Sequence, residues 1–97
     1  MNHCSFFGKC YKMHYTSDDV EKIEVILQIE NKRKGKSDVK RMDYENLTFE
    51  AWGTAAISIF KNLKINDSML IIDSTARNEN GKTYFRINEF KILKKEN

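Results

Sequence analysis

Residues 44–64 read YENLTFEAWGTAAISIFKNLK, and the spacing of the apolar side chains changes in the middle of this stretch. Up to residue 52, apolar and polar residues alternate, which is typical of a β-strand with one buried face. We expect a strand over 44–52 whose inward face carries Leu47, Phe49 and Ala51. Its outward face is expected to carry Asn46, Thr48, Glu50 and Trp52.

After Gly53 the apolar spacing becomes that of a helix. Four apolar side chains follow the i, i+3, i+4, i+7 pattern of one buried helical face, namely Ala56, Ile59, Phe60 and Leu63. This pattern predicts an α-helix over 54–64. Thr54 is the expected N-cap, because its hydroxyl can accept a hydrogen bond from a free backbone N–H of the first turn.

Residues 22–30 (KIEVILQIE) alternate even more regularly. The inward face of this strand is expected to carry Ile23, Val25, Leu27 and Ile29, and the outward face Glu24, Ile26, Gln28 and Glu30. A polar stretch centred on Lys34-Gly35-Lys36 separates this strand from 44–52. Two strands around such a stretch indicate a hairpin, so we expect the polar stretch to be its exposed loop.

Three further strands complete the expected fold. Residues 3–12 are β-compatible, with Gly8 indicating a bulge or a bend, and YTSDD (15–19) is typical of a turn. Residues 68–76 and 83–93 are expected to pair through Asn80-Gly81, the strongest hairpin signal in the chain. Five strands with a helix between the third and the fourth predict an all-β, five-stranded OB-fold barrel. Ninety-seven residues suit a single domain over 1–97, with a core over about 4–93 and a frayed tail at 94–97.

The positive charge is concentrated in one segment. Residues 32–41 (KRKGKSDVKR) carry a charge of +5, whereas the whole chain carries only +3, so the remainder sums to −2. A basic patch on a near-neutral body favours a polyanionic partner. The cations of the patch are Lys32, Arg33, Lys34, Lys36, Lys40 and Arg41. A solvated charge run and a nuclear localisation signal are the alternatives, and the second fits poorly between two paired strands.

Other classes of protein find little support. No apolar window approaches the roughly 20 residues of a membrane span, and the first residues lack the pattern of a secretory signal, so we expect a cytoplasmic protein. His3, Cys4, Cys10 and His14 are not expected to bind metal, because a strand over 3–12 would separate the cysteines by about 20 Å. Both thiols are expected to be reduced and structural. We find no catalytic motif and expect neither an enzyme nor a cofactor.

Five segments resemble, in register over about residues 4–93, the bacterial single-stranded DNA-binding protein family. FFGK is similar to the end of the family's first strand, and YTSDD with VILQIEN is similar to its turn and second strand. NLTFEAWGTAA resembles the third strand, which ends in an aromatic residue, together with the segment leading into the helix. LKINDSMLI resembles the start of the fourth strand, and INEFKIL resembles the end of the fifth. The resemblance implies binding of single-stranded DNA in replication or recombination, largely without sequence preference.

The chain also departs from this family. Of the positions where the family stacks bases on aromatic rings, only Trp52 keeps an aromatic residue, while Asn46, Arg33 and the region of Asn78 do not. We also expect no counterpart of the family's acidic-tipped tail. A short chain with lysines in place of aromatics resembles the PriB-like primosomal branch of the family, and the sequence leaves both branches open.

The resemblance implies two groups of site residues. Trp52 would stack a base, and the cations of 32–41 would follow the phosphate backbone. Around the last hairpin, further contacts are expected from Arg77, Lys82, Tyr84 and Arg86. Only one of Tyr84 and Phe85 can face outward, and the sequence leaves open which one. Trp52 could instead cover the helix or line a dimer interface.

Three acidic residues oppose this hypothesis. Glu24, Glu30 and Glu50 are expected on the outward faces, where they would repel phosphates unless they pair with the loop lysines. The alternative is therefore an OB-fold adaptor, a PriB-like replication accessory that contacts proteins and binds nucleic acid weakly, and an RNA-binding OB module is a third hypothesis. The expected partners are single-stranded DNA or RNA, replication proteins, and further copies of the chain in a homodimer or homotetramer. The family also implies association with the nucleoid.

Overall fold

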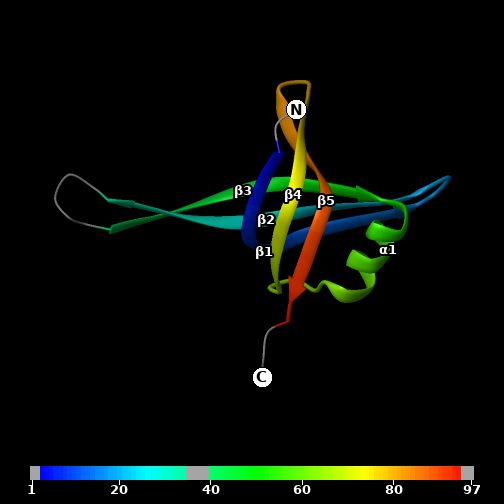
Figure 1. The fold of residues 1–97 in the computed structure, drawn as a ribbon, viewed down its shortest axis with the longest axis horizontal. Helices are drawn as coiled ribbons and strands as arrows, with labels where there is room; N and C mark the ends of the chain where they lie inside the picture. Colours follow the sequence, from blue (N-terminus) through cyan, green and yellow to red (C-terminus); the bar gives the residue numbers. More distant parts are fainter. Residues whose placement is uncertain (1–2, 35–39, 95–97) are drawn as a thin grey trace.

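Five strands close into a barrel in the computed structural model, which describes residues 3–34 and 40–94 (Figure 1). The elements are β1 (His3–Ser17), β2 (Glu21–Lys34), β3 (Lys40–Trp52), α1 (Gly53–Asn62), β4 (Ser68–Glu79) and β5 (Lys82–Leu93). This order confirms the expected β-barrel with one helix between the third and fourth strands. The strands β2, β3 and β4 are longer than expected, because their pairing continues into the polar residues that flank each alternating core.

The strand order around the barrel is β1-β2-β3-β5-β4, and β4 closes the barrel against β1. All neighbours are antiparallel except β3 and β5, which run parallel over a short stretch. There, Thr48 lies beside Tyr84 and Phe49 lies beside Phe85. This parallel contact brings the last hairpin next to β3, although the two are about 35 residues apart in the sequence.

β1 changes partner in its middle, at Lys9, next to Gly8. Residues up to Lys9 pair with β4, and residues from Lys9 onward pair with β2, with an irregularity in register between Cys10 and Lys12. A Cβ atom at Gly8 would lie 2.8 Å from the backbone oxygen of Gln28, so only glycine lets the two strands approach this closely. The irregularities of register in β1 lie on either side of Gly8, between Cys4 and Phe6 and between Cys10 and Lys12, so the expected bulge is not at Gly8 itself. The expected turn at 15–19 is shorter, since β1 continues to Ser17.

The helix differs from expectation at its N-cap and at Phe60. It begins at Gly53, its N-cap is Trp52, and no side chain caps it, so the assignment of Thr54 was wrong. Gly53 adopts a positive φ of 65°, which turns the chain from β3 directly into the helix one residue earlier than expected. Phe60 is 51% exposed rather than buried, because its ring stacks on Tyr15 at 4.2 Å between centroids, on the outside of the molecule.

The barrel interior is filled by the alternating residues of the strands. Ile23, Val25, Leu27 and Phe49 have no exposed surface, as expected, and Ala56 and Ile59 close the barrel from the helix. Asn80 and Gly81 have φ values of 52° and 78°, which confirms the expected two-residue turn between β4 and β5. Of the expected frayed tail, residues 95–97 lie outside the described residues, and Lys94 forms an ion pair with Asp67 at 3.3 Å.

Candidate nucleic-acid interface

One continuous outward surface covers β2, β3 and β5. In an antiparallel pair, residues directly opposite each other point to the same side, so Lys22 shares a side with Trp52 and Glu24 with Glu50. The parallel contact adds β5 residues to the same side, because Tyr84 lies beside Thr48 and Arg86 beside Glu50. We call this surface the β2–β3–β5 face; it carries Lys22, Glu24, Ile26, Gln28, Glu30, Tyr44, Asn46, Thr48, Glu50, Trp52, Tyr84 and Arg86.

Trp52 lies at the end of this face where β3 meets the helix. The indole is partly exposed, and two cations lie near its ring: Lys22 Nζ is 5.4 Å and Arg86 Cζ 5.5 Å from the ring centroid. Cations at such distances are attracted by the ring quadrupole and restrict the motion of the ring. The indole is therefore held by its neighbours and still has surface that a base can contact.

Tyr84, and not Phe85, points outward from β5. Phe85 packs inside the barrel against Phe6, at 4.8 Å between ring centroids, and against Phe49, at 5.3 Å. Tyr84 is partly exposed, with Arg77 Cζ 4.7 Å and Lys82 Nζ 5.0 Å from its ring centroid. The structure thus brings together Arg77, Lys82 and Tyr84, three of the residues expected around this hairpin.

Tyr44 is a third aromatic side chain on the β2–β3–β5 face, and the sequence analysis missed it. Its side chain is 55% exposed and lies opposite Glu30 of β2. The strand alternation contained the signal, because residues 44, 46, 48, 50 and 52 share one side of β3. The family position at Asn46 is not aromatic in this chain, and the aromatic residue lies two positions earlier on the same side.

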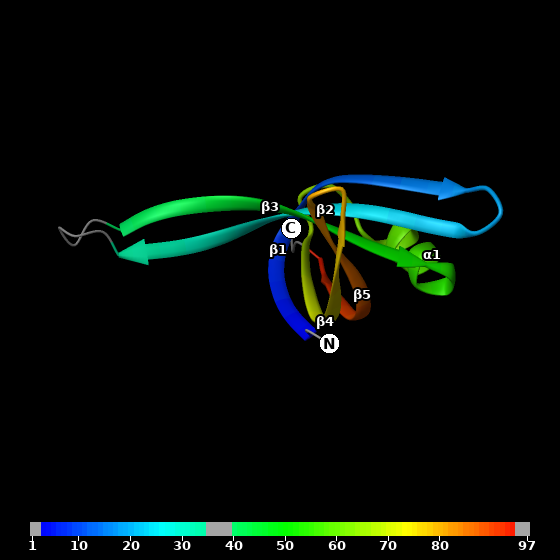
Figure 2. The ribbon, with the colours of Figure 1, turned by 90° about the horizontal axis from the view of Figure 1, so that it is seen from above.

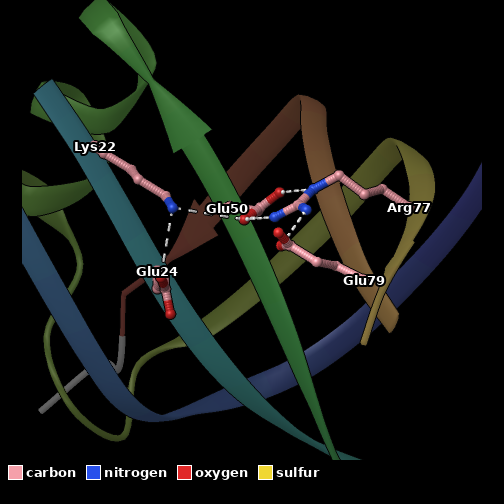
Figure 3. Close-up of polar contacts among 5 residues, drawn as sticks. All are labelled: Lys22, Glu24, Glu50, Arg77 and Glu79. Atoms are coloured by element: carbon pink, nitrogen blue, oxygen red, sulfur yellow. Dashed lines mark hydrogen bonds and ion pairs between the residues drawn. The ribbon is translucent and has the colours of Figure 1, made fainter. Parts of the chain in front are cut away.

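Glu50 lies near the centre of the face and is fully buried, whereas an exposed side chain was expected. Its carboxylate accepts two hydrogen bonds from Arg77, from Nε and from Nη2, each 2.8 Å long (Figure 3). Lys22 Nζ lies 3.9 Å from Glu50 and 3.5 Å from Glu24. Side chains from β2 and β4 therefore cover Glu50. Among the described side chains, Lys22 and Arg77 balance its charge.

Arg77 uses its whole guanidinium in this network. Its third nitrogen, Nη1, donates to Glu79 at 2.7 Å. Hydrogen bonds to the carboxylates of Glu50 and Glu79 raise the pKa of Arg77 above its ordinary value, and the same contact with Arg77 lowers the pKa of Glu79. The structure therefore places Arg77 among carboxylates, while Lys82 and Arg86 lie beside the aromatic rings.

The basic segment was expected to be a loop throughout, but its residues 32–34 and 40–41 lie in two paired strands. β2 continues to Lys34 and β3 begins at Lys40, so a two-stranded ribbon projects from the barrel (Figure 2). We call residues 32–34 and 40–41 the basic arm. Arg33 lies opposite Arg41, and Lys34 lies opposite Lys40. Lys36 lies outside the described residues.

The cysteines and the remaining surface show no second site of this kind. In the described part of the chain, Cys4 and Cys10 are free thiols, and burial together with the charge of Asp67 raises the pKa of Cys10 to about 11. Among residues 3–34 and 40–94, no group of three or more metal-ligating side chains occurs. No helix in the same ranges is both long and apolar enough to cross a bilayer.

The fold and this face together define an OB-fold barrel with an outward aromatic and cationic surface. No family model matches the chain, and no curated protein matches its sequence. Solved structures do match. PriB from Ralstonia solanacearum has a TM-score of 0.74 at 9% identity, covering 95% of this chain and 97% of that chain.

Two further structures extend the comparison. Wild-type single-stranded DNA binding protein from Thermus aquaticus has a TM-score of 0.76 at 13% identity, covering 97% of this chain and 50% of that chain. This chain thus spans about half the length of that protein. A dimeric structure of the N-terminal domain of PriB from Thermoanaerobacter tencongensis has a TM-score of 0.62 at 15% identity, covering 97% and 98% of the two chains. At such low identities the likeness shows the fold, which is the OB-fold of these proteins.

Proposed function

We propose that this chain is a single OB-fold domain of the single-stranded DNA-binding type, including the PriB-like branch. It would bind single-stranded DNA without catalysis and largely without sequence preference, in replication or recombination. The similarity of its fold to single-stranded DNA binding protein and to PriB supports this proposal. The face itself supplies the chemical argument.

The observation that carries the proposal is the arrangement of Tyr44, Trp52 and Tyr84 on one outward face. Aromatic rings stack on bases of any identity, since every base has a π-face, and each stacked base contributes about 1–3 kcal/mol. The basic arm continues the same pair of strands, β2 and β3, beyond the rings. A strand of nucleic acid could therefore place its bases on the rings and its phosphates along the arm, near Lys82 and near Arg86.

The first test is a titration of the protein with oligo(dT) at two salt concentrations. Trp52 is the only tryptophan, so its fluorescence reports on one position of the face. Strong quenching with salt-sensitive affinity would agree with a stacked base at Trp52. Salt-sensitive binding seen by anisotropy without quenching would favour a PriB-like, mainly electrostatic mode. No binding at low salt would contradict the proposal.

A second test addresses the arm. Replacing Lys32, Arg33, Lys34 and Lys36 by glutamine should weaken binding and reduce the slope of log K against log salt by up to about 3, or about 0.7 for each phosphate that is no longer neutralised. The matched control neutralises four exposed lysines elsewhere, namely Lys9, Lys61, Lys64 and Lys91. It changes the net charge equally and should leave most of the slope intact. Equal slopes for the two variants would remove the arm from the binding site.

A second candidate function is an adaptor that contacts a protein. Glu24 and Glu79 are exposed acidic side chains near the aromatic rings, and they would suit a basic partner surface better than a phosphate. Replication proteins are the partners that we expect in either case. Tighter binding of oligo(rU) than of oligo(dT) would favour the third hypothesis, an RNA-binding module, because the 2′-hydroxyl is the group by which a protein tells RNA from DNA.

We also propose that the chain forms a homodimer or a homotetramer. Phe7 is 53% exposed and, together with Leu93, lines an open hollow of about 270 Å³ on the surface of β1 and β5. A second copy of the chain would cover these apolar side chains, as in an assembly that places several binding faces on one strand. Light scattering should then give a multiple of 11.5 kDa, and Phe7→Ser should shift the mass toward the monomer. A monomer at every concentration would contradict this assembly.

A further inference from the structure

Glu50 connects the two ends of the β2–β3–β5 face. Its side chain leaves β3 on the outward side and is nevertheless fully buried, because cations from β2 and β4 lie over it (Figure 3). A buried carboxylate is tolerated only where charged partners satisfy it, so these contacts must persist in the folded protein. The other contacts of the two cations show what Glu50 holds in place.

The first connection runs through Arg77 to Tyr84. Two parallel hydrogen bonds of 2.8 Å join the guanidinium to both oxygens of Glu50. Such a paired contact fixes the plane of the guanidinium as well as its position. The same guanidinium lies 4.7 Å from the centroid of the Tyr84 ring. The position of Tyr84 therefore depends on Glu50 through one planar group.

The second connection runs through Lys22 to Trp52. Lys22 Nζ lies 3.9 Å from a Glu50 oxygen and 5.4 Å from the centroid of the Trp52 ring. A lysine is a point charge, so it constrains the ring less than the guanidinium does. Arg86, which lies 5.5 Å from the same centroid, adds a second cation beside Trp52.

We infer that Glu50 is a positioning residue that sets the Trp52 and Tyr84 rings relative to one another, so that bases meet them as a fixed pair. This inference rests on the proposed function. It also assigns a path to the nucleic acid. The central network holds two cations, Lys22 and Arg77, and three carboxylates, Glu24, Glu50 and Glu79. Arg86, which lies beside Glu50 in register, brings the charge of this centre to 0, so the centre gives phosphates no net attraction. Bases would cross it, and phosphates would pass at the basic arm and the last hairpin.

Glu50→Gln tests the inference, because it keeps the size of the side chain and removes the charge that holds both cations. Glu89→Gln is the matched control, since it removes the same charge from an exposed side chain of β5 outside this network. In the free protein, Glu50→Gln should make Trp52 more accessible to the neutral quencher acrylamide. On titration with oligo(dT), the quenching of Trp52 should fall and the affinity should drop on the order of tenfold, as for a partly lost stack, with an unchanged salt slope. Glu89→Gln should behave like the unaltered protein.

Two outcomes would overturn the inference. Tighter binding with a steeper salt slope would mean that Glu50 acts only by repelling phosphates. Unchanged acrylamide quenching, together with unchanged oligo(dT) quenching, would mean that Glu50 does not hold the indole. Failure of the unaltered protein to bind oligo(dT) would refute the proposed function instead, and the acrylamide measurement on the free protein would still test the position of Trp52.

A second variant covers the case in which Glu50→Gln does not fold. Arg77→Lys keeps every charge but cannot form the two parallel bonds, and the Arg77 side chain is 39% exposed, so the barrel tolerates the change. If Arg77 acts through Tyr84, Arg77→Lys should weaken oligo(dT) binding in the unaltered background and have little further effect in a Tyr84→Ala background. Additive losses in this double-mutant cycle would show that Arg77 does not work through the ring.

Discussion

Gly8→Ala should destabilise the barrel, because β1 and β2 are too close at this position for a Cβ atom. The added methyl carbon would lie 2.8 Å from the backbone oxygen of Gln28, 3.0 Å from Cγ1 of Ile29 and 3.2 Å from Cβ of Leu27. The nearest atom belongs to the backbone of a paired strand, so it cannot move aside by rotation of a side chain. The strands themselves must separate at the point where β1 changes partner.

The magnitude follows from two opposing effects. Overpacking of a core costs about 1–3 kcal/mol, and a backbone contact places this site in the upper half of that range. Alanine restricts the unfolded chain more than glycine does, and this effect raises the free energy of unfolding by about 0.4–1 kcal/mol. The free energy of unfolding should therefore fall by about 2 kcal/mol, and the melting temperature of a domain of this size by about 8–16 °C.

Equilibrium unfolding in urea, followed by Trp52 fluorescence and by circular dichroism, measures the loss. Gly81 provides the control, since it has a positive φ of 78° and open space around its Cα. At Gly81, asparagine should be tolerated better than alanine, because asparagine adopts the left-handed conformation more readily. At Gly8, asparagine should be worse than alanine because it is larger. A Gly8→Ala variant as stable as the unaltered protein would refute the close-approach argument.

Three further predictions concern Trp52, the thiols and one loop carboxylate. Trp52→Ala should weaken oligo(dT) binding by about 1–3 kcal/mol, whereas Trp52→Phe should keep most of the affinity; equal losses in anisotropy titrations would argue against stacking. Cys10, whose pKa is raised to about 11 by burial, should resist alkylation by iodoacetamide at pH 8, while the less buried Cys4 reacts; mass spectrometry of the labelled chain decides this. The Lys64 backbone N–H, and then Lys94, lower the pKa of Asp67. The stability that Asp67 contributes should therefore be present above the ordinary aspartate pKa and lost as the pH falls through the lowered one, and Asp67→Asn should flatten this acid limb in thermal melts.

The strands and their inward faces could be predicted from the sequence, because alternation is a local signal. Residues 22–30 and 44–52 contain five of the twelve buried apolar side chains of the described core, and the Asn80-Gly81 turn depends only on its own two residues. The outward order of Tyr44, Asn46 and Trp52 was available from the same alternation. The family resemblance, however, pointed only to the positions of Asn46 and Trp52, so Tyr44 was not predicted as a site residue.

The burial of Glu50 could not be predicted in this way. Alternation places Glu50 outward, and it does point outward, but Arg77 of β4 and Lys22 of β2 cover it. Arg77 reaches Glu50 because β5 pairs in parallel with β3 and carries β4 beside it, a contact between segments far apart in the sequence. The choice between Tyr84 and Phe85 also depended on that contact. Local patterns therefore defined the strands, and barrel closure defined the face.

The parallel contact between β3 and β5 has a consequence for folding during synthesis on the ribosome. When residues up to Trp52 have emerged, the long β2–β3 hairpin can form, but one edge of β3 has no neighbour until Tyr84, Phe85 and Arg86 follow. An open strand edge is a template for pairing with other chains, and pairings between distant segments form slowly. A nascent chain therefore exposes an unpaired edge of β3, which is prone to aggregation, before the β2–β3–β5 face is complete. When β5 pairs with β3, it covers the open edge and adds Tyr84 and Arg86 to the face, so both changes occur in the same step.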